Sequence, residues 1–192
     1  MQELKERIVK EGKVLPGNII KVDGFLNHRI DTELMDHIAE EFGKPFNMDE
    51  VTMVLTAEAS GIALATAVAT YFHKPMIFAK KAKSDNIEGG LYQSDIYSYT
   101  YKKKVTLLVS KEWLSSDDKV LIIDDFMANG EAMRGLCDIV TAAGATLMGI
   151  GCAVEKGFQG GGDRLRAAGV NLKSLAIIES AEPGNIVFRD DD

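Results

Sequence analysis

The chain of 192 residues is long enough for an α/β domain with a substantial hydrophobic core. Its composition is typical of a water-soluble globular protein, and its formal net charge of −7 argues against a general binder of nucleic acid or membrane surfaces. We find no secretory signal and no apolar stretch of membrane-spanning length. Two cysteines within apolar segments indicate buried, reduced thiols and therefore a cytoplasmic location.

Apolar periodicity predicts two helices near the N-terminus, with an irregular segment between them. The first helix ends at Gly12, and the second begins at Asp31 or Thr32, either of which can cap it. Residues 14–31 are apolar but broken by proline and glycine, which indicates an extended segment laid against the rest of the chain. The second helix should bury an apolar face made of Met35, Ile38, Ala39 and Phe42.

Apolar runs separated by helical patterns predict buried strands of a parallel sheet with helices on both faces. Residues 83–104 break this pattern because they are polar with interleaved tyrosines. We expect a hairpin here, in which residues 105–109 pair with residues 96–101 through a turn at residues 102–104. The five predicted strands of the sheet cover residues 51–56, 75–79, 120–125, 147–154 and 175–178.

The central feature is the stretch VLIIDDFMANGEA at residues 120–132. A buried strand ends there in Asp124 and Asp125, at the sheet edge where open α/β folds bind ligands. The small-residue loop that follows brings backbone N–H groups and a helix N-terminus to the same place, which suits an anion. Carboxylates beside a phosphate cradle indicate a ligand such as a ribose 5-phosphate.

Three other ligand sites or folds share parts of this pattern. A dinucleotide site would need G-x-G-x-x-G after a strand, and a P-loop would need G-K-[ST], and both motifs are missing. A phosphoacceptor receiver domain carries its aspartate pair after the first strand, whereas only 67 residues follow Asp125 here. The remaining alternative is that the two aspartates simply begin a surface turn.

The same stretch resembles the diphosphate-sugar motif of the type I phosphoribosyltransferases. That motif is a buried strand, two acidic residues, a small-residue loop, Thr-Gly and a hydroxyl residue. Here Asn129 replaces the threonine and Ala132 replaces the second hydroxyl, so backbone N–H groups and the Asn129 amide must carry more of the phosphate binding. The variant A-N-G-x-A is similar to that of the xanthine-using branch of the family. The stretches KVDGFLNH, EASGIA, IYSYT and VEKGFQ extend the resemblance over nearly the whole chain.

The resemblance implies the type I phosphoribosyltransferase fold as a single domain at residues 1–192. Its mainly parallel five-stranded sheet would be flanked by helices. Residues 1–31 would form an N-terminal base-binding segment, and residues 83–109 a small hood with a flexible loop. The loop AEASG at residues 57–61 matches the pyrophosphate loop of the family, although such a turn could also be an ordinary strand-to-helix connection.

Lys80 and Lys81 match basic residues near the diphosphate in the family, although a lysine pair by itself is also common at a solvated strand end. The resemblance gives Asp124 and Asp125 the catalytic role. The residues that it implies for binding phosphoribosyl diphosphate are Ala59, Ser60, Gly61, Lys81, Ala128, Asn129, Gly130, Glu131 and Ala132.

Lys156 matches the family residue that contacts the purine base. A lysine donates hydrogen bonds only, so it would select an oxo group at purine position 6, reject the amino group of adenine and favour the mildly acidic xanthine. The alternative is a surface lysine that pairs with Glu155. Asn27 matches a xanthine contact, Ile20 an apolar base contact, and Phe126 could stack on the purine. Phe158 is a second candidate for stacking, and either ring could instead belong to the core.

The resemblance implies transfer of the 5-phosphoribosyl group from phosphoribosyl diphosphate to xanthine, giving xanthosine monophosphate and pyrophosphate in purine salvage. It also implies a homodimer, and Mg²⁺ that arrives with the diphosphate rather than a metal site built from protein ligands alone. Guanine or hypoxanthine as the base remains open, because Lys156 does not separate the 6-oxopurines. A regulator that senses phosphoribosyl diphosphate and binds nucleic acid is disfavoured by the charge of −7, and we expect no nucleic-acid or membrane partner.

Overall fold

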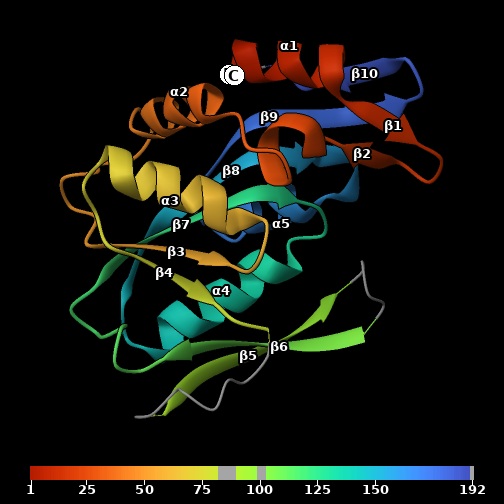
Figure 1. The fold of residues 1–192 in the computed structure, drawn as a ribbon. Coiled ribbons are helices and arrows are strands. Elements are labelled where there is room, and N and C mark those ends of the chain that lie inside the picture. Colours follow the sequence, from red (N-terminus) through yellow and green to blue (C-terminus); the bar gives the residue numbers. More distant parts are fainter. Residues whose placement is uncertain (82–89, 99–102, 191–192) are drawn as a thin grey trace.

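The fold is built on a six-stranded sheet with the strand order β10-β9-β8-β7-β3-β4. The computed structural model describes residues 1–81, 90–98 and 103–190 (Figure 1). Five strands of this sheet, β3, β4, β7, β8 and β9, are parallel to one another, as predicted, and β10 pairs antiparallel with β9. The strands are β3 (Met53–Ala57), β4 (Met76–Ala79), β7 (Lys119–Met127), β8 (Thr146–Lys156), β9 (Leu172–Glu182) and β10 (Asn185–Phe188).

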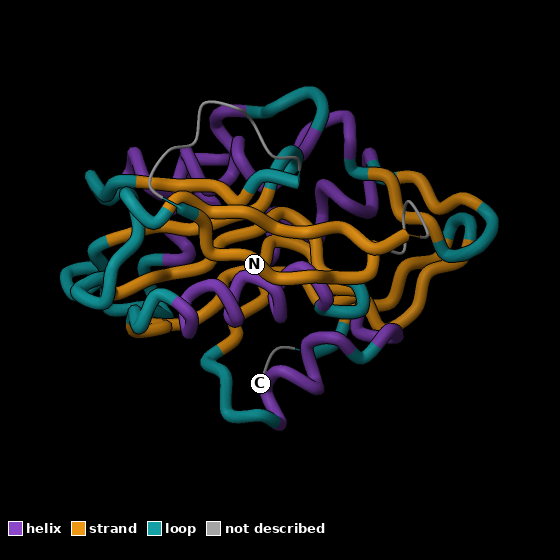
Figure 2. The backbone as a smooth tube through the Cα atoms, turned by 90° about the horizontal axis from the view of Figure 1, so that it is seen from below, coloured by secondary structure: helices purple, strands orange, loops and turns teal. Residues whose placement is uncertain are grey.

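Two hydrophobic cores lie on the two faces of this sheet. Because successive side chains of a strand point to opposite faces, neighbours such as Leu121 and Ile122 belong to different cores. Helices α1, α2 and α3 cover one face, and α4 with a separate hairpin covers the other (Figures 1 and 2). The helices are α1 (Gln2–Glu11), α2 (Thr32–Phe42), α3 (Gly61–Tyr71), α4 (Glu131–Ala142) and α5 (Gly161–Ala167).

Local sequence signals account for the helix boundaries near the N-terminus. Gly12 follows the last residue of α1, and the Asp31 carboxylate caps α2 by accepting a hydrogen bond from the Leu34 N–H at 3.2 Å. The four predicted core residues of α2 are all buried. Between the helices, β1 (Lys13–Leu15) and β2 (Ile19–Lys21) pair as a short hairpin, and a π-helical turn (Asp23–Asn27) follows. The extended segment that we predicted therefore contains two short strands.

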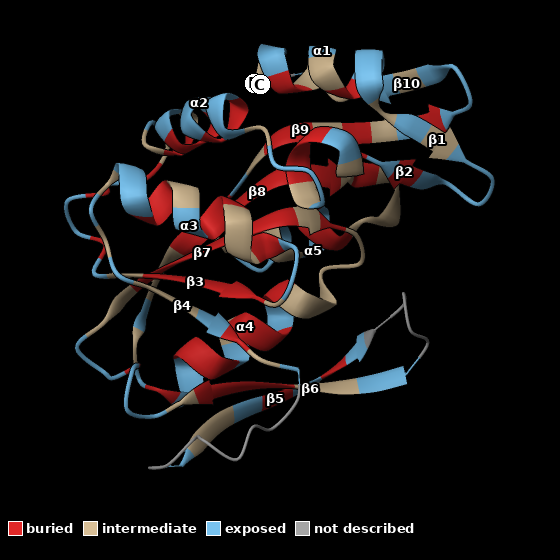
Figure 3. Ribbon diagram, viewed as in Figure 1, coloured by how far each residue is buried: buried red, intermediate tan, exposed pale blue. Residues whose placement is uncertain are grey.

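Two predictions of local structure were wrong. The second predicted strand, β4, is not buried, because it lies at the sheet edge and exposes Phe78 (Figure 3). Cys137 in α4 is half-buried, whereas Cys152 in β8 is buried as predicted, and both are free thiols.

The hairpin that leaves the sheet consists of β5 (Leu91–Ser98) and β6 (Lys103–Ser110), paired antiparallel. The hairpin itself is confirmed, but the predicted register was wrong: residues 105–109 pair with residues 92–96 rather than 96–101, and Lys103 and Lys104 belong to β6 rather than to the turn. The rest of the turn and the loop at residues 82–89 lie outside the described residues. Two backbone hydrogen bonds between Lys80 and Leu108 tie the hairpin to the end of β4. Among the helices that the structure describes, none is long and apolar enough to cross a membrane.

Candidate active site

A cavity of about 370 Å³ lies at the carboxyl edge of the parallel sheet, where β3, β7 and β8 end. Its walls come from the N-terminal segment, the loop after β3, the hairpin, β7 with its following loop, and the end of β8. The structure thus brings together residues that are far apart in the sequence. The predicted site residues that line it are Ile20, Asn27, Ser60, Lys81, Asp124, Asp125, Phe126, Ala128, Asn129, Gly130, Glu131, Ala132 and Lys156.

The remaining predicted residues do not line this cavity. Ala59 and Gly61 flank Ser60 in the loop after β3, and Lys80 is tied to Leu108 through its backbone. Gly61 lies behind the cavity wall, where an ideal Cβ atom on it would come within 2.3 Å of Asp124 Oδ1 and 2.2 Å of Thr56 Oγ1. Only glycine therefore lets α3 begin directly beside the Asp124 carboxylate.

The loop after β7 has the geometry of an anion cradle. Strand β7 continues to Met127, so Asp124 and Asp125 lie within the strand, shortly before its final residue. Gly130 then adopts a φ of 78°, a left-handed conformation that suits glycine, and α4 begins at Glu131. The first residues of α4 line the cavity, and the first N–H groups of a helix have no acceptor within the helix.

Both carboxylate oxygens of Asp125 accept hydrogen bonds from other walls of the cavity. Asn27 Nδ2 donates to Oδ2 at 2.7 Å, and Ser60 Oγ donates to Oδ1 at 2.9 Å. Asp125 is 1% exposed. It therefore connects the N-terminal segment, the loop after β3 and strand β7 at a single carboxylate.

The Asp124 carboxyl group is buried directly beside Asp125. Burial, followed in size by the charge of Asp125, raises the pKa of Asp124 well above its usual value. Its Oδ1 atom accepts a hydrogen bond from the Asp125 backbone N–H at 3.1 Å. Two adjacent acids in a cavity of this kind can hold hydroxyl groups or a hydrated cation, and can stabilise positive charge.

Lys156 lines the cavity and lies near the N-terminal segment. Its Nζ atom donates to the Asn18 carbonyl oxygen at 3.2 Å and lies 5.3 Å from the centre of the Phe126 ring. Burial lowers the pKa of Lys156. The alternative pairing with Glu155 was wrong, because Glu155 is fully buried and pairs with Arg166 at 2.7 Å.

Of the two aromatic candidates for stacking, Phe126 lines the cavity, whereas Phe158 packs against the hydrophobic core. Glu58 and Tyr97 are among the wall residues to which the sequence assigned no role. Glu58 accepts a hydrogen bond from the Lys81 N–H at 2.5 Å and so ties the loop after β3 to the end of β4. Glu58 lies in the small-residue loop directly before Ala59, and this position was the signal by which the sequence could have identified it as a site residue.

The fold and the cavity define a class of α/β protein that binds a phosphorylated sugar beside a pair of acids. Residues 26–168 match the family model of the phosphoribosyl transferase domain. The chain belongs to the phosphoribosyltransferase family, as the resemblance implied.

Curated relatives match the chain over its whole length. The xanthine phosphoribosyltransferase of Lachnoclostridium phytofermentans is 52% identical, over 100% of this chain and 100% of the relative. The protein of the same name from Bifidobacterium animalis subsp. lactis is 53% identical, over 98% of this chain and 100% of the relative. Among solved structures, the APRTase from Giardia lamblia has a TM-score of 0.76 at 20% identity, over 93% of this chain and 98% of that one. That likeness confirms the fold.

Proposed function

We propose that this protein transfers the 5-phosphoribosyl group from phosphoribosyl diphosphate to xanthine, giving xanthosine monophosphate and pyrophosphate. The observation that carries this proposal is the arrangement of one cavity. It holds the acid pair of β7 and the loop that follows this strand, together with Lys156 from β8 and Asn27 from the N-terminal segment. Full-length relatives at about half identity that are named xanthine phosphoribosyltransferase support the choice of base.

The acid pair suits the charge that develops in this reaction. Breaking the bond at the sugar carbon places positive charge on the ribose ring and negative charge on the leaving pyrophosphate. Asp124 and Asp125 would bind the ribose hydroxyls and stabilise the cationic ring. Lys81 and the loop with Ser60 would face the leaving group. No covalent nucleophile is required, so positioning and charge complementarity supply the rate gain.

The base would lie beside Lys156 and Phe126, because these two side chains are close together in the cavity wall. The ammonium group of Lys156 can donate to the 6-oxo group of a purine and cannot accept from the 6-amino group of adenine. Asn27 offers a donor and an acceptor on the same side. We assign the 5-phosphate to the loop at residues 128–132, at the N-terminus of α4.

The carboxylates of Asp124 and Asp125 also fit magnesium, which favours hard oxygen ligands and usually keeps part of its water shell when it binds with a substrate diphosphate. Those two side chains would hold that water shell, and the bound ion would neutralise charge on the leaving pyrophosphate. The homodimer and the cytoplasmic location stay predictions, the first of which light scattering of the purified protein tests directly.

The test of the proposed reaction is a product analysis. The purified protein is incubated with phosphoribosyl diphosphate and xanthine, with and without magnesium. We expect xanthosine monophosphate and pyrophosphate in equal amounts, and only in the presence of magnesium. Xanthine that stays unconverted under both conditions would overturn the proposal.

A further inference from the structure

The glycine turn at the start of α5 packs backbone to backbone against the loop that we assign to the 5-phosphate. An ideal Cβ atom on Gly161 would lie 2.3 Å from the Ala128 carbonyl oxygen and 2.7 Å from the Gly130 nitrogen. From the other side, a Cβ atom on Gly130 would lie 3.4 Å from the Gly161 Cα atom. Position 161 therefore has no room for a side chain unless the loop moves.

Arg164 adds a specific contact from the same helix to the same loop. Its Nη2 atom donates to the Asn129 carbonyl oxygen at 3.1 Å. The Arg164 side chain is exposed and is not part of the cavity wall, so it reaches the loop from behind. Its Nη1 atom lies only 3.2 Å from where a Cβ atom on Gly160 would be, so the guanidinium group packs over the glycine turn.

These contacts determine where the loop N–H groups point. In a trans peptide unit the carbonyl oxygen and the N–H that follows it point in opposite directions. The only cis peptide among the described residues is Glu58–Ala59, so the peptide units of the loop are trans. The Ala128 oxygen faces Gly161, and the Asn129 oxygen is held by Arg164. The N–H groups of Asn129 and Gly130 are thereby directed to the opposite side, toward the cavity that these residues line.

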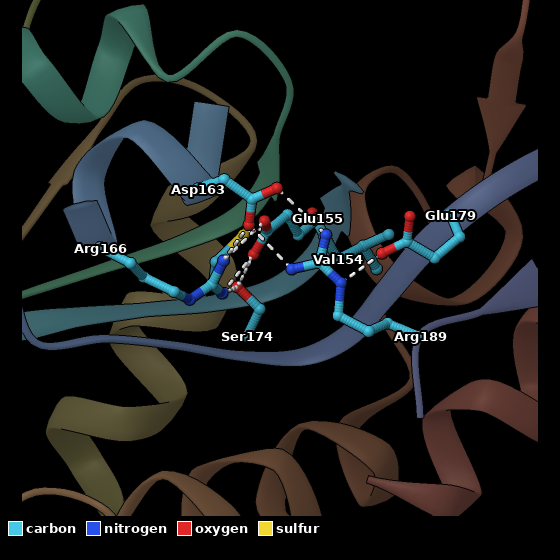
Figure 4. A network of polar contacts seen from close by, with 8 residues as sticks. Val154, Glu155, Asp163, Arg166, Ser174, Glu179 and Arg189 are labelled. Carbon is cyan, nitrogen blue, oxygen red and sulfur yellow. Dashed lines mark hydrogen bonds and ion pairs between the residues drawn. The ribbon is translucent and has the colours of Figure 1, made fainter. Parts of the chain in front are cut away.

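Helix α5 is itself anchored to the sheet by a buried carboxylate. Glu155 on β8 accepts hydrogen bonds from Arg166 Nη1 at 3.0 Å and Nη2 at 2.7 Å, and also from Ser174 Oγ on β9 (Figure 4). A Cβ atom on Gly162 would lie 2.0 Å from Glu155 Oε1, so the turn sits directly on this carboxylate. A bidentate arginine pair with a buried partner fixes orientation as well as position.

A second ion-pair group holds the same helix to the segment that follows β10. Arg189 contacts both carboxylate oxygens of Asp163, at 2.8 and 3.1 Å, and its Nε atom pairs with Glu179 on β9 (Figure 4). With one anchor on the buried side and one on the exposed side, α5 can act as a fixed support.

We propose that Gly161 and Arg164 are positioning residues for the reaction: they hold the carbonyl groups of the phosphate loop on its rear side, so that its N–H groups are presented to the 5-phosphate of the substrate. This inference rests on the proposed function, since it takes the loop as the 5-phosphate site. Neither residue lines the cavity. The support matters more here because Ala132 contributes no hydroxyl group to the phosphate.

The test compares two ligands that use different parts of the site. Ribose 5-phosphate carries the 5-phosphate, whereas pyrophosphate would occupy the loop after β3. In Arg164→Ala we expect the Kd of ribose 5-phosphate to rise roughly three- to tenfold, and that of pyrophosphate to stay within about twofold. The KM of phosphoribosyl diphosphate should rise with it, while the KM of xanthine and the melting temperature stay close to the parent values. Lys173→Ala, which removes an exposed cation from β9, is the matched control and should change none of these.

Gly161→Ala provides a steric test of the same support. Its methyl group must displace the loop, so ribose 5-phosphate should bind more weakly than in Arg164→Ala, again with pyrophosphate spared. Equal losses of both ligands in both variants, or parent-like binding of ribose 5-phosphate, would overturn the inference. A loss in Arg164→Ala that disappears at high salt would also overturn it, because it would mark a screened charge rather than a held loop. A wild-type protein that converts no base would instead contradict the proposed function.

Discussion

Asn27 Nδ2 donates a hydrogen bond of 2.7 Å to Asp125 Oδ2, across a separation of 98 residues in the chain. The first residue ends the π-helical turn of the N-terminal segment, and the second belongs to β7 at the proposed ribose site. The bond therefore joins the proposed base site to the proposed sugar site. A ribose hydroxyl that donates to Asp125 would compete with Asn27 for this oxygen, and the Asn27 amide N–H could then donate to the 2-oxo group of xanthine.

Replacement of Asn27 by alanine should consequently affect bases according to their group at position 2. We expect kcat/KM for xanthine to fall about tenfold, the loss expected for a hydrogen bond at a binding site. Guanine should lose less, because its 2-amino group cannot accept a hydrogen bond. Steady-state kinetics with both bases measure the ratio. Equal losses for xanthine and guanine would show that Asn27 does not distinguish the two groups.

Asp125→Asn should lower kcat at least tenfold and leave the fold intact. The substitution removes the negative charge that would stabilise the cationic sugar, and one of the two oxygens that accept from Asn27 and Ser60 becomes a donor. Turnover and circular dichroism spectra measure the two effects separately. Asp36→Asn, on the exposed side of α2, is the control and should behave as the parent. Parent-like turnover in Asp125→Asn would remove Asp125 from the catalytic role.

Asp124→Asn should inactivate the enzyme and also stabilise it at neutral pH. A carboxyl group whose pKa is raised by folding binds its proton more tightly in the folded state than in the unfolded chain. Its ionisation, as the pH rises above the usual 3.8 and through the raised pKa, therefore lowers the free energy of unfolding. A neutral amide avoids that cost, and each kcal/mol regained corresponds to roughly 2–4 °C in Tm for a chain of this size.

Thermal unfolding at pH 7 and at pH 4 checks this expectation for Asp124. The gain in Tm should be larger at the higher pH, since the parent carboxyl group is protonated at the lower one. A lower Tm for Asp124→Asn than for the parent at pH 7 would show that ionised Asp124 does not destabilise the fold.

Lys156 should make xanthine use sensitive to alkaline pH. Only the charged ammonium group donates with full strength, and burial lowers its pKa below the usual 10.5. As the pH rises through this lowered pKa, kcat/KM for xanthine should fall. In Lys156→Arg the decline from this group should move to higher pH, because guanidinium stays charged above pH 12 or so. Since both proteins use the same base, ionisation of xanthine cancels in their ratio. Identical pH profiles would contradict a role for the Lys156 charge.

Lys156→Met tests the same residue through specificity. The apolar side chain removes the donor to the 6-oxo group, so kcat/KM for xanthine should fall at least tenfold. Activity with adenine, which we expect to be low in the parent, should fall less, so the ratio of xanthine to adenine use should decrease. An unchanged ratio of xanthine to adenine use would assign the discrimination at position 6 to another group.

Local patterns predicted the parts of this structure that local physics determines. The apolar run before Asp124, the cap at Asp31 and the glycine at position 130 each left a signal within a few residues. The sequence signal of strand β10 is weaker, because this strand has only four residues and half of them are exposed. Its antiparallel pairing depends on a turn at Gly184, which has a φ of 81°.

Sequence patterns could not predict contacts between segments that are distant in the chain. That Glu155 is buried against Arg166 rather than paired with Lys156 follows from α5 folding back over β8. The contact of Gly161 with the loop at residues 128–130 likewise depends on how two connections meet in space. Nearly all predicted site residues nevertheless line one cavity, because the carboxyl ends of neighbouring parallel strands meet at one edge.

A competition among bases tests the central claim most directly. The protein is given phosphoribosyl diphosphate and magnesium with equal amounts of xanthine, guanine, hypoxanthine and adenine, and the nucleotide products are separated by chromatography. Our account predicts that xanthosine monophosphate forms first and in the largest amount, with the least product from adenine. Adenosine or guanosine monophosphate as the main product, or no nucleotide at all, would contradict it.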